Sequence, residues 1–450
     1  MSPALFSLTN IARRSLPALI ALACSSSLFG SMHARAQALF VESEIRAPLC
    51  SDRKMEEILA PARKDKDAVV IDCSPRLNRN DRITRRMVLR GQQAQGVVLD
   101  CHGGLLDGGK GSINHNKDMI VIRSVQNKQG EWSVPSNIII RNCEIRGSAR
   151  IFGMDQNGEG QTVRASSRME GHTARARQAA PRHVWFDHVS LIGQGRIPLY
   201  VSPGTTHVTV SDSSFSGETD STAIYLDAES AHNLFLNNRI ETKTSVRELI
   251  AIDGSSHNKF INNHFSSLSH GGIFVYRNCG EGGTIRHATP SYNQFINNSF
   301  YYDKFVGFNI NLEKLADMKL SFETPAIWIA SRNGGKSYCN ADKGFGMGSS
   351  VNDRDLAKHN VIIQNQFFKL SPERMIVVNE QPNIVSDNIT VSQRINRAAG
   401  CYLEDGQSGY FLHSGQQMLA AINRPRPGCN RQVYSCSNGL LQPLAGSCRP

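Results

Sequence analysis

Short apolar stretches recur along the middle of the chain, and each one ends in a polar corner. Asn233–Asn238, Asn258–Asn263 and Asn293–Asn298 all place apolar residues between asparagines and end in an asparagine pair. Asp187 and Asp212 begin a series of corner residues spaced by 25, which continues with insertions. The later members of this series are Asn237, Asn262, Asn297, Asn365 and Asp387.

A second set of apolar stretches follows at a matching offset. Its β-branched and aromatic residues, between glycine, asparagine and serine corners, predict two or three short strands in every repeat. An all-β right-handed parallel β-helix of about nine or ten coils over residues 68–392 is therefore predicted. The repeated asparagines predict a ladder of stacked amides. The second strands are Leu199–Val201, Ile224–Leu226, Ile250–Ile252, Ile273–Val275, Ile327–Ile329 and Ile376–Val378.

Other repetitive folds fit this pattern less well. A leucine-rich repeat needs leucines at fixed offsets, which are absent, and a β-sandwich would not keep a 25-residue register.

A solenoid also needs caps at its open ends. Residues 37–67 are the expected N-terminal cap, with a helix over 52–63 that places Met55, Ile58 and Leu59 on one face. Residues 393–450 are expected to form a cysteine-rich cap, or alternatively a carbohydrate-binding knob.

The first 36 residues have the features of an export signal. Arg13 and Arg14 precede the apolar run Leu16–Ala23, and Ala34-Arg35-Ala36 fits a cleavage site. A periplasmic or secreted protein is predicted, and lipidation of Cys24 is the alternative. Elsewhere, no stretch approaches the roughly 20 apolar residues that span a bilayer, so no transmembrane segment is predicted.

The cysteines support export. Of the 11 cysteines, all but Cys24 follow the signal, and an even set in an exported chain predicts up to five disulfides. Local pairing is expected within the first four and within the last four, which leaves Cys279 and Cys339 to clamp the middle. A metal site is disfavoured because no C-x-x-C pair occurs. The four N-terminal cysteines are Cys50, Cys73, Cys101 and Cys143, and the four C-terminal ones are Cys401, Cys429, Cys436 and Cys448.

The formal net charge of +11 favours an acidic partner. Residues 154–182 are rich in arginine, including Arg164 and Arg168, and contain no aromatic residue. This segment is expected to be a cationic lid, with a disordered insertion as the alternative. Nucleic acid is not the expected partner, because export removes it and base stacking needs aromatic side chains.

The coils and asparagine corners resemble the right-handed parallel β-helix superfamily, which includes pectate lyases, alginate lyases and epimerases, and NosD-like proteins. The resemblance covers about residues 68–392 and implies a carbohydrate-active protein. The Asp-Pro-His-Asp signature of alginate C5-epimerases and a pectate-lyase calcium motif are missing from the sequence. The resemblance therefore implies the fold and leaves the reaction open.

The candidate site lies where ionisable residues fall on neighbouring coils. Asp227, Asp253 and Tyr276 follow successive second strands, and Arg247 and His270 precede two of them, as Arg196 precedes an earlier one. Adjacent aspartates repel one another unless Ca²⁺, a proton or a nearby arginine compensates. All three solutions stay open, with Arg247 or Arg277 as the arginine. The alternative is that these corner residues only end the strands and face water.

Residues 270–287 concentrate the residue types that uronate chemistry requires. An enzyme of this class must neutralise a carboxylate, remove the α-proton and protonate the leaving oxygen. An exposed catalytic face is predicted from Asp227, Arg247, Asp253, His270, Tyr276 and Arg277, with Asp227 and Asp253 as the Ca²⁺ ligands if an ion is bound. The predicted substrate-binding residues are Glu229, Glu281, Arg332, Arg164 and Arg168.

Three functions remain. The first is lyase or epimerase chemistry on an acidic polysaccharide. The second is glycoside hydrolysis by Asp227, Asp253 or Glu229, because hydrolases need carboxyl groups about 5–9.5 Å apart, a spacing that adjacent or next-but-one coils could supply. The third is a non-catalytic glycan-binding or surface-structural β-helix. Ca²⁺ is the one cofactor considered, and the sequence does not predict an oligomeric state.

Overall fold

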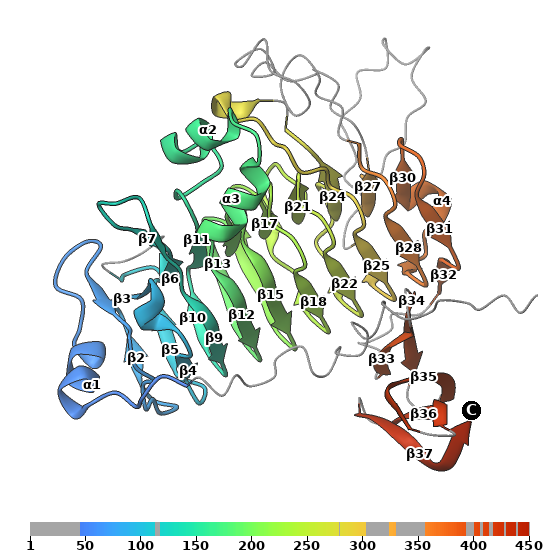
Figure 1. Ribbon diagram of the computed structural model, residues 1–450, viewed down its shortest axis with the longest axis horizontal. Helices are drawn as coiled ribbons and strands as arrows, with labels where there is room; N and C mark the ends of the chain where they lie inside the picture. Colours follow the sequence, from blue (N-terminus) through green and yellow to red (C-terminus); the bar gives the residue numbers. More distant parts are fainter. Residues whose placement is uncertain are drawn as a thin grey trace, which may run out of the picture.

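The computed structural model describes residues 46–112, 118–278, 280–302, 324–329 and 356–392, together with five C-terminal strands. Three parallel sheets run side by side along one axis, and the chain visits each of them once in every coil (Figure 1). This arrangement is the predicted parallel β-helix. Ten strands in the first sheet agree with the expected number of coils.

The first sheet carries the candidate site on its outer face. Its strands, in spatial order, are β1 (Ala68–Val70), β3 (Arg86–Arg90), β6 (Asp118–Arg123), β11 (Ser148–Phe152), β14 (Leu199–Val201), β17 (Ile224–Leu226), β21 (Ile250–Asp253), β24 (Ile273–Tyr276), β27 (Ile327–Ile329) and β30 (Ile376–Val378).

The second and third sheets complete each coil. The second consists of β2 (Arg82–Ile83), β5 (Leu105–Asp107), β10 (Glu144–Arg146), β13 (Ser190–Gly195), β16 (Ser214–Thr219), β19 (Arg239–Ile240), β23 (His264–Phe265), β26 (Ser299–Phe300), β29 (Gln366–Phe368) and β32 (Ile389–Val391), with β20 (Lys243–Thr244) paired to β16. The third consists of β4 (Val98–Asp100), β9 (Ser136–Arg141), β12 (Arg182–Asp187), β15 (Thr206–Ser211), β18 (Leu234–Leu236), β22 (Lys259–Ile261), β25 (Gln294–Ile296), β28 (Val361–Ile363) and β31 (Ile384–Ser386).

A few elements lie outside these sheets. They are the helices α1 (Asp52–Leu59), α2 (Gln161–Ser167), α3 (His172–Ala179) and α4 (Pro372–Met375), the hairpin β7 (Val125–Gln126) with β8 (Trp132–Ser133), and the C-terminal strands β33 (Gly400–Asp405), β34 (Ser408–His413), β35 (Gln417–Arg426), β36 (Cys429–Ser437) and β37 (Leu440–Arg449). The C-terminal strands pair antiparallel, which distinguishes them from the coils.

Stacked aromatic rings fill part of the solenoid interior. Phe235 and Phe260 are fully buried, and their ring centroids lie 4.6 Å apart. Phe265, Phe300 and Phe367 form a second buried stack with spacings of 4.8 and 5.2 Å. These spacings match the strand separation of a sheet. Each coil therefore repeats the packing of its neighbour.

Asparagine ladders hold successive coils in register, as predicted. Asn258 Nδ2 donates to Asn293 Oδ1 at 2.8 Å, while Asn258 Oδ1 accepts from Asn233 Nδ2 at 2.9 Å. Each amide satisfies polar groups that would otherwise be buried unpaired. The two inner ladders are Asn233, Asn258, Asn293, Asn360 and Asn383, and Asn238, Asn263, Asn298, Asn365 and Asn388.

The predicted corner series is wrong at two positions. Asp187 pairs with Ser211, so His188, and not Asp187, is the equivalent of Asp212. Asn365 belongs to an inner ladder, and Gln364 takes the corner before it. The corner needs positive φ, which asparagine, aspartate and histidine adopt more readily than most residues. The corner column is Asn142, His188, Asp212, Asn237, Asn262, Asn297, Gln364 and Asp387, with φ between 49° and 59°.

Helix α1 caps the N-terminal coil. Ser51 accepts from the backbone N–H of Lys54 at the N-cap. Met55 and Ile58 are buried, whereas Leu59, the last residue of the helix, is 39% exposed. The predicted helix over 52–63 ends four residues early, at Leu59. The cap is therefore a shorter helix than expected.

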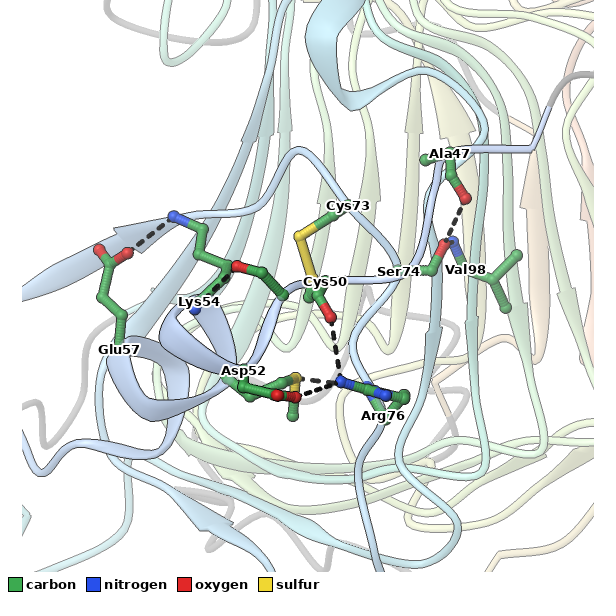
Figure 2. The surroundings of a disulfide bond; sticks show 11 residues. Ala47, Cys50, Asp52, Lys54, Glu57, Cys73, Ser74, Arg76 and Val98 are labelled. Carbon is green, nitrogen blue, oxygen red and sulfur yellow. Dashed lines mark hydrogen bonds and ion pairs between the residues drawn. A yellow bond between two sulfur atoms is a disulfide. The ribbon is translucent and has the colours of Figure 1, made fainter.

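Two disulfides fasten the first coils. Cys50 joins Cys73, and Cys101 joins Cys143, which confirms local pairing in the N-terminal third. Figure 2 shows Arg76 beside the first disulfide, where its Nη2 donates to the carbonyl of Cys50 and lies 2.7 Å from Asp52 Oδ1.

Several predictions fall on residues outside the described part of the chain. They are the export signal, the clamp by Cys279 and Cys339, and the side chains of the four C-terminal cysteines. Within the described residues, no helix is long and apolar enough to cross a membrane.

Candidate functional site

Ionisable side chains gather on the outer face of the first sheet, where β17, β21 and β24 end. Asp253 pairs in register with Tyr276, and Asp227 follows Leu226, which pairs with Ile252. The predicted column of Asp227, Asp253 and Tyr276 on adjacent coils is therefore present. Its side chains point away from the apolar interior because the flanking strand residues point inward.

The column is covered, and the expectation of an exposed face is wrong. Asp227 is 4% exposed and Asp253 is completely buried. The cover is here called the lid and consists of residues 153–180 and 280–289. Its two parts contact one another, since Ile285 N–H donates to Ser167 Oγ at 3.1 Å. Figure 1 shows α2 beside the 3₁₀ turn Glu281–Gly283, drawn in yellow.

The arginine-rich segment thus forms a lid, as predicted, and not a disordered insertion. The reason is that it folds into α2 and α3, whose buried residues pack down onto the coil. Gly158 N–H reaches Asp227 Oδ2 at 3.1 Å. A Cβ at Gly158 would lie 2.8 Å from this carboxylate, so only glycine permits the approach.

Asp227 carries the perturbed carboxyl group of the site. Tyr200 Oη donates to its Oδ2 at 2.5 Å, and Ala228 N–H donates to its Oδ1 at 2.8 Å. Burial raises the pKa of Asp227 to about 6, and Asp253 adds to the shift while Arg286 opposes it. Asp227 can therefore hold or release a proton close to neutral pH.

Asp253 is held by a different set of donors. Tyr225 Oη donates at 2.8 Å, and Asn278 donates from its backbone at 2.7 Å and from its side chain at 2.5 Å. Arg286 Nε lies 3.9 Å from Asp253 Oδ2. The aspartates are thus compensated by an arginine, but this is neither Arg247 nor Arg277, which the sequence suggested.

Arg286 is the internal cation of the cluster. It is 2% exposed, and its Nη1 donates to the carbonyls of Glu281 and Thr284. Burial alone would lower the pKa of Arg286, but Asp253 and Asp227 outweigh it and raise this pKa. Sequence inspection missed this role, because nothing in the spacing places residue 286 over residue 253.

The predicted Ca²⁺ ligands do not fit a calcium ion in this arrangement. The oxygens of Asp227 and Asp253 accept hydrogen bonds from hydroxyl and N–H groups, and Arg286 supplies the positive charge. Calcium takes six to eight oxygen ligands, whereas the donors here would face the ion with hydrogen atoms.

Arg247, Glu248 and Tyr276 form a second group next to the aspartates. Arg247 Nη2 donates to Glu248 Oε1 at 2.7 Å and to Tyr276 Oη at 2.5 Å, and Tyr276 donates to Glu248 Oε1 at 3.1 Å. Burial alone would lower the pKa of Arg247, but Tyr276 and Glu248 outweigh this effect and raise it. The Arg247 side chain is 32% exposed, so this group reaches solvent. Glu248 was not among the predicted site residues, although it adjoins Arg247 in the sequence.

Glu229 fastens the lid, and its predicted role in substrate binding is not supported by its position. It is completely buried. Its carboxylate accepts from Thr173 Oγ1 of α3 and from the backbone N–H groups of His287 and Ala288. His172 lies nearby, and burial lowers its pKa to about 4. One carboxylate therefore links both parts of the lid to the coil.

The other predicted residues lie around this centre. His270 contacts Thr244 and Ser269 and has no described bond to the aspartate cluster. Arg277 is completely buried and not on an exposed face. Glu281 Oε2 accepts from Asn278 at 2.8 Å and lies 3.9 Å from Arg286.

Two of the predicted substrate-binding arginines lie on the exposed surface of α2 and at its end. These are Arg164 and Arg168, and Arg168 Nη2 donates to the carbonyl of Gly283. Arg332 lies outside the described residues.

Aromatic rings and a cavity extend the outer face in both directions from the cluster. Tyr200 and Tyr225 lie 5.9 Å apart, and further along the same register Phe274 meets Trp328 edge-on at 4.9 Å. Trp328 is 37% exposed. At the other end, a cavity of about 320 Å³ is lined by Arg123, Gln126, Trp132, Phe152, Asp155 and Gln156, among others.

A row of histidines on the third sheet was also missed. His183, His207, His232 and His257 occupy equivalent positions on successive coils, where φ is positive. These four histidines are spaced by 24, 25 and 25 residues in the sequence, and this near-coil period could have predicted the row. The predicted corners were asparagine and aspartate alone, although histidine also adopts positive φ.

The family comparison agrees with the fold. Residues 182–318 match the family model described as the right handed beta helix region. The chain is a right-handed parallel β-helix. No curated protein matches it.

Solved β-helix structures resemble the chain at low identity. The surface adhesin PfbA of Streptococcus pneumoniae is 13% identical, with 69% of this chain and 57% of that chain covered and a TM-score of 0.32. The mannuronan C-5 epimerase AlgE6 A-module of Azotobacter vinelandii is 8% identical, with 72% and 81% covered and a TM-score of 0.32. The alginate lyase of Paenibacillus sp. str. FPU-7 is 11% identical, with 74% and 96% covered and a TM-score of 0.31.

These proteins differ in what they do, and the chain spans little more than half of the adhesin. The likenesses therefore leave the reaction of this β-helix open.

Proposed function

We propose that this β-helix is an exported enzyme that acts on an acidic polysaccharide along the outer face of its first sheet, by lyase or epimerase chemistry. The observation that carries the proposal is the group of Arg247, Glu248 and Tyr276. A phenol hydroxyl lies 2.5 Å from a guanidinium and 3.1 Å from a carboxylate. This arrangement suits proton transfer, because the phenol oxygen is hydrogen-bonded to a guanidinium on one side and to a carboxylate on the other.

The same three residues could perform the first step on a uronate. Arg247 would neutralise the substrate carboxylate, which makes the neighbouring C–H bond more acidic. Tyr276 would remove that proton while passing its own to Glu248. The electron pair then either expels the glycosidic oxygen, giving an unsaturated sugar, or accepts a proton on the opposite face, giving the epimer. Asp227, with its pKa of about 6, is the candidate acid for the departing oxygen.

The surroundings suit an extended sugar polymer. Phe274 and Trp328 offer aromatic surface on one side of the group, and the 320 Å³ cavity beside Trp132 lies on the other. Because Tyr276 is only 4% exposed, substrate access requires the residues around it to move. The exported location is part of the proposal, and the two disulfides are consistent with it.

The test is incubation with uronate polymers and with the same polymers after reduction of their carboxyl groups to alcohols. Unsaturated products identify a lyase, and deuterium uptake at C5 from heavy water without cleavage identifies an epimerase. Both activities should vanish on the reduced polymers, since Arg247 would have no carboxylate to neutralise. Binding without any turnover would reject the enzymatic proposal in favour of a glycan-binding protein.

Hydrolysis is the second candidate function, and one observation favours it. Asp227 has a raised pKa whereas Asp253, on the next coil, is held by several donors, which is the asymmetry that an acid and a base or nucleophile require. New reducing ends without unsaturation, lost in an Asp227→Asn variant, would support hydrolysis instead.

A further inference from the structure

A row of stacked rings runs along the third sheet, at the corner where its strands begin. His183, His207, His232 and His257 are followed in the same row by Tyr292 and then His359. The ring centroids of successive histidines lie 4.7, 5.3 and 4.8 Å apart, with interplanar angles between 17° and 35°. The row is therefore a continuous line of four imidazoles, one on each coil.

The edges of these rings, and not their faces, are presented to solvent. His207, His232 and His257 are exposed and His183 is half-buried. Each face is covered by the next ring, so the row offers no flat surface on which a sugar could stack. What remains accessible is a line of ring nitrogens and carbons.

We propose that His183, His207, His232 and His257 form a surface binding site for divalent transition-metal ions, Cu²⁺, Ni²⁺ or Zn²⁺, each held by imidazoles from neighbouring coils. Imidazole is a preferred ligand of these metals. Metal–nitrogen bonds of about 2.0–2.1 Å place two ligand nitrogens no more than about 4.2 Å apart. The ring centroids of neighbouring histidines lie 4.7–5.3 Å apart, so two side chains must turn their nitrogens toward one another to hold one ion. Four histidines taken in pairs hold at most two ions.

The protonation state suits the proposal. Metal ions bind the neutral ring, so a histidine that is already unprotonated pays no proton-release cost at neutral pH. Partial burial and neighbouring imidazoles lower the pKa of His207 and His232 to about 4. The pKa values of His183 and His257 are also lowered, chiefly by burial.

Nearby cations oppose the binding of a metal and provide a second test. Arg177 lies close enough to lower the pKa of three of the histidines, and its Nε donates to the carbonyl of Glu229. In the same way, the charge of Arg182 lowers the pKa of His183, and the charge of Lys259 lowers the pKa of His232. Replacing Arg177 by glutamine should therefore tighten metal binding, because a repelling charge is removed.

The described residues contain one other cluster of ligand types, and the experiment separates the two. Asp187, His188 and Asp212 have ligand atoms within 4.8 Å of one another. They lie near the opposite end of the same strands, so an ion bound there would not involve the histidine row. A variant at His188 reports on this alternative.

The experiment is a calorimetric titration of the tag-free full-length protein with CuCl₂, NiCl₂ or ZnCl₂ at about pH 7.5, where imidazoles are neutral. The test variant is His207→Asn/His232→Asn, which leaves no two histidines adjacent in the row and keeps a residue that tolerates positive φ. The matched control is His188→Asn. Circular dichroism checks that each variant keeps its fold.

We expect saturable binding of no more than two ions per chain. The affinity should fall by about tenfold or more in the double variant and stay unchanged in His188→Asn. The melting temperature of the wild type should rise with metal concentration, as linkage requires. The proposal is overturned if the wild type binds no metal saturably, if the double variant binds as tightly as the wild type, or if His188→Asn abolishes binding.

Discussion

Replacing Arg286 by methionine should destabilise the protein strongly at about pH 8 and less at about pH 5. Arg286 Nε lies 3.9 Å from Asp253 Oδ2, and both residues are almost completely buried. At an effective dielectric constant of about 20, two unit charges at this separation attract by about 4 kcal/mol. Removing one partner of a buried pair costs about 3–5 kcal/mol, because the other charge stays buried without compensation.

The pH dependence distinguishes this mechanism from a simple loss of packing. Arg286 holds down the pKa of Asp227, so this pKa should rise further above its value of about 6 when the arginine is removed. At about pH 5 Asp227 is then protonated, so the cluster carries one negative charge fewer and depends less on a counter-charge. Methionine keeps most of the aliphatic stem, so lost packing alone would cost the same at both pH values.

The assay is urea unfolding followed by circular dichroism, at both pH values. Arg146→Met is the matched control, because Arg146 pairs with Glu144 in a salt bridge whose side chains are 44% and 38% exposed. That exposed pair should be worth about 1 kcal/mol or less. The reasoning is refuted if Arg286→Met loses no more stability than the control at about pH 8, or if its loss is equal at both pH values.

Three further predictions concern stability. Asn263→Ala should cost about 2–4 kcal/mol in urea unfolding, because it removes four buried ladder hydrogen bonds to Asn238, Asn298 and the carbonyl of Phe235; a loss under about 1 kcal/mol would contradict the ladder's role. Reducing Cys50–Cys73 and Cys101–Cys143 should lower the melting temperature, since each bridge typically contributes about 2–4 kcal/mol; an unchanged melting temperature would count against this. The pKa of Asp227 is raised from 3.8 to about 6, so the native state binds its proton more readily than the unfolded state, and this group should make the protein more stable as the pH falls from about 7 to 4. Asp227→Asn should remove that part of the pH dependence, and an identical pH profile in the variant would argue against the shift.

The coil architecture could be predicted because it is periodic. Apolar strand residues and asparagine corners recur once in every coil. Asn258 and Asn293 therefore occupy equivalent positions of neighbouring repeats in the sequence, and they are hydrogen-bonded neighbours in the ladder. The column of Asp227, Asp253 and Tyr276 followed from the same periodicity. The errors at Asp187 and Asn365 arose where one coil is a residue shorter or an insertion intervenes, since a shift of one residue moves a side chain to the opposite face.

The cover over the site could not be predicted, because insertions have no periodicity. Arg286 and Glu229 gain their roles from contacts between a lid and a coil that are distant in sequence: Glu229 accepts from Ala288, and Asp227 accepts from Gly158. Nothing in the spacing indicates such pairs. The expectation of an exposed face failed for this reason, whereas the residue types gathered there were largely predicted.

The central claim is tested most directly by Tyr276→Phe, compared with Tyr225→Phe, on a uronate polymer. Both tyrosines donate a hydrogen bond to a carboxylate on the outer face of the first sheet, but Tyr276 also accepts from Arg247. If Tyr276 transfers the proton, its variant should lose about 100-fold or more in kcat, with the fold intact, while Tyr225→Phe keeps a much larger share of the activity. Full activity in Tyr276→Phe would contradict the proposal and move the chemistry away from Arg247, Glu248 and Tyr276.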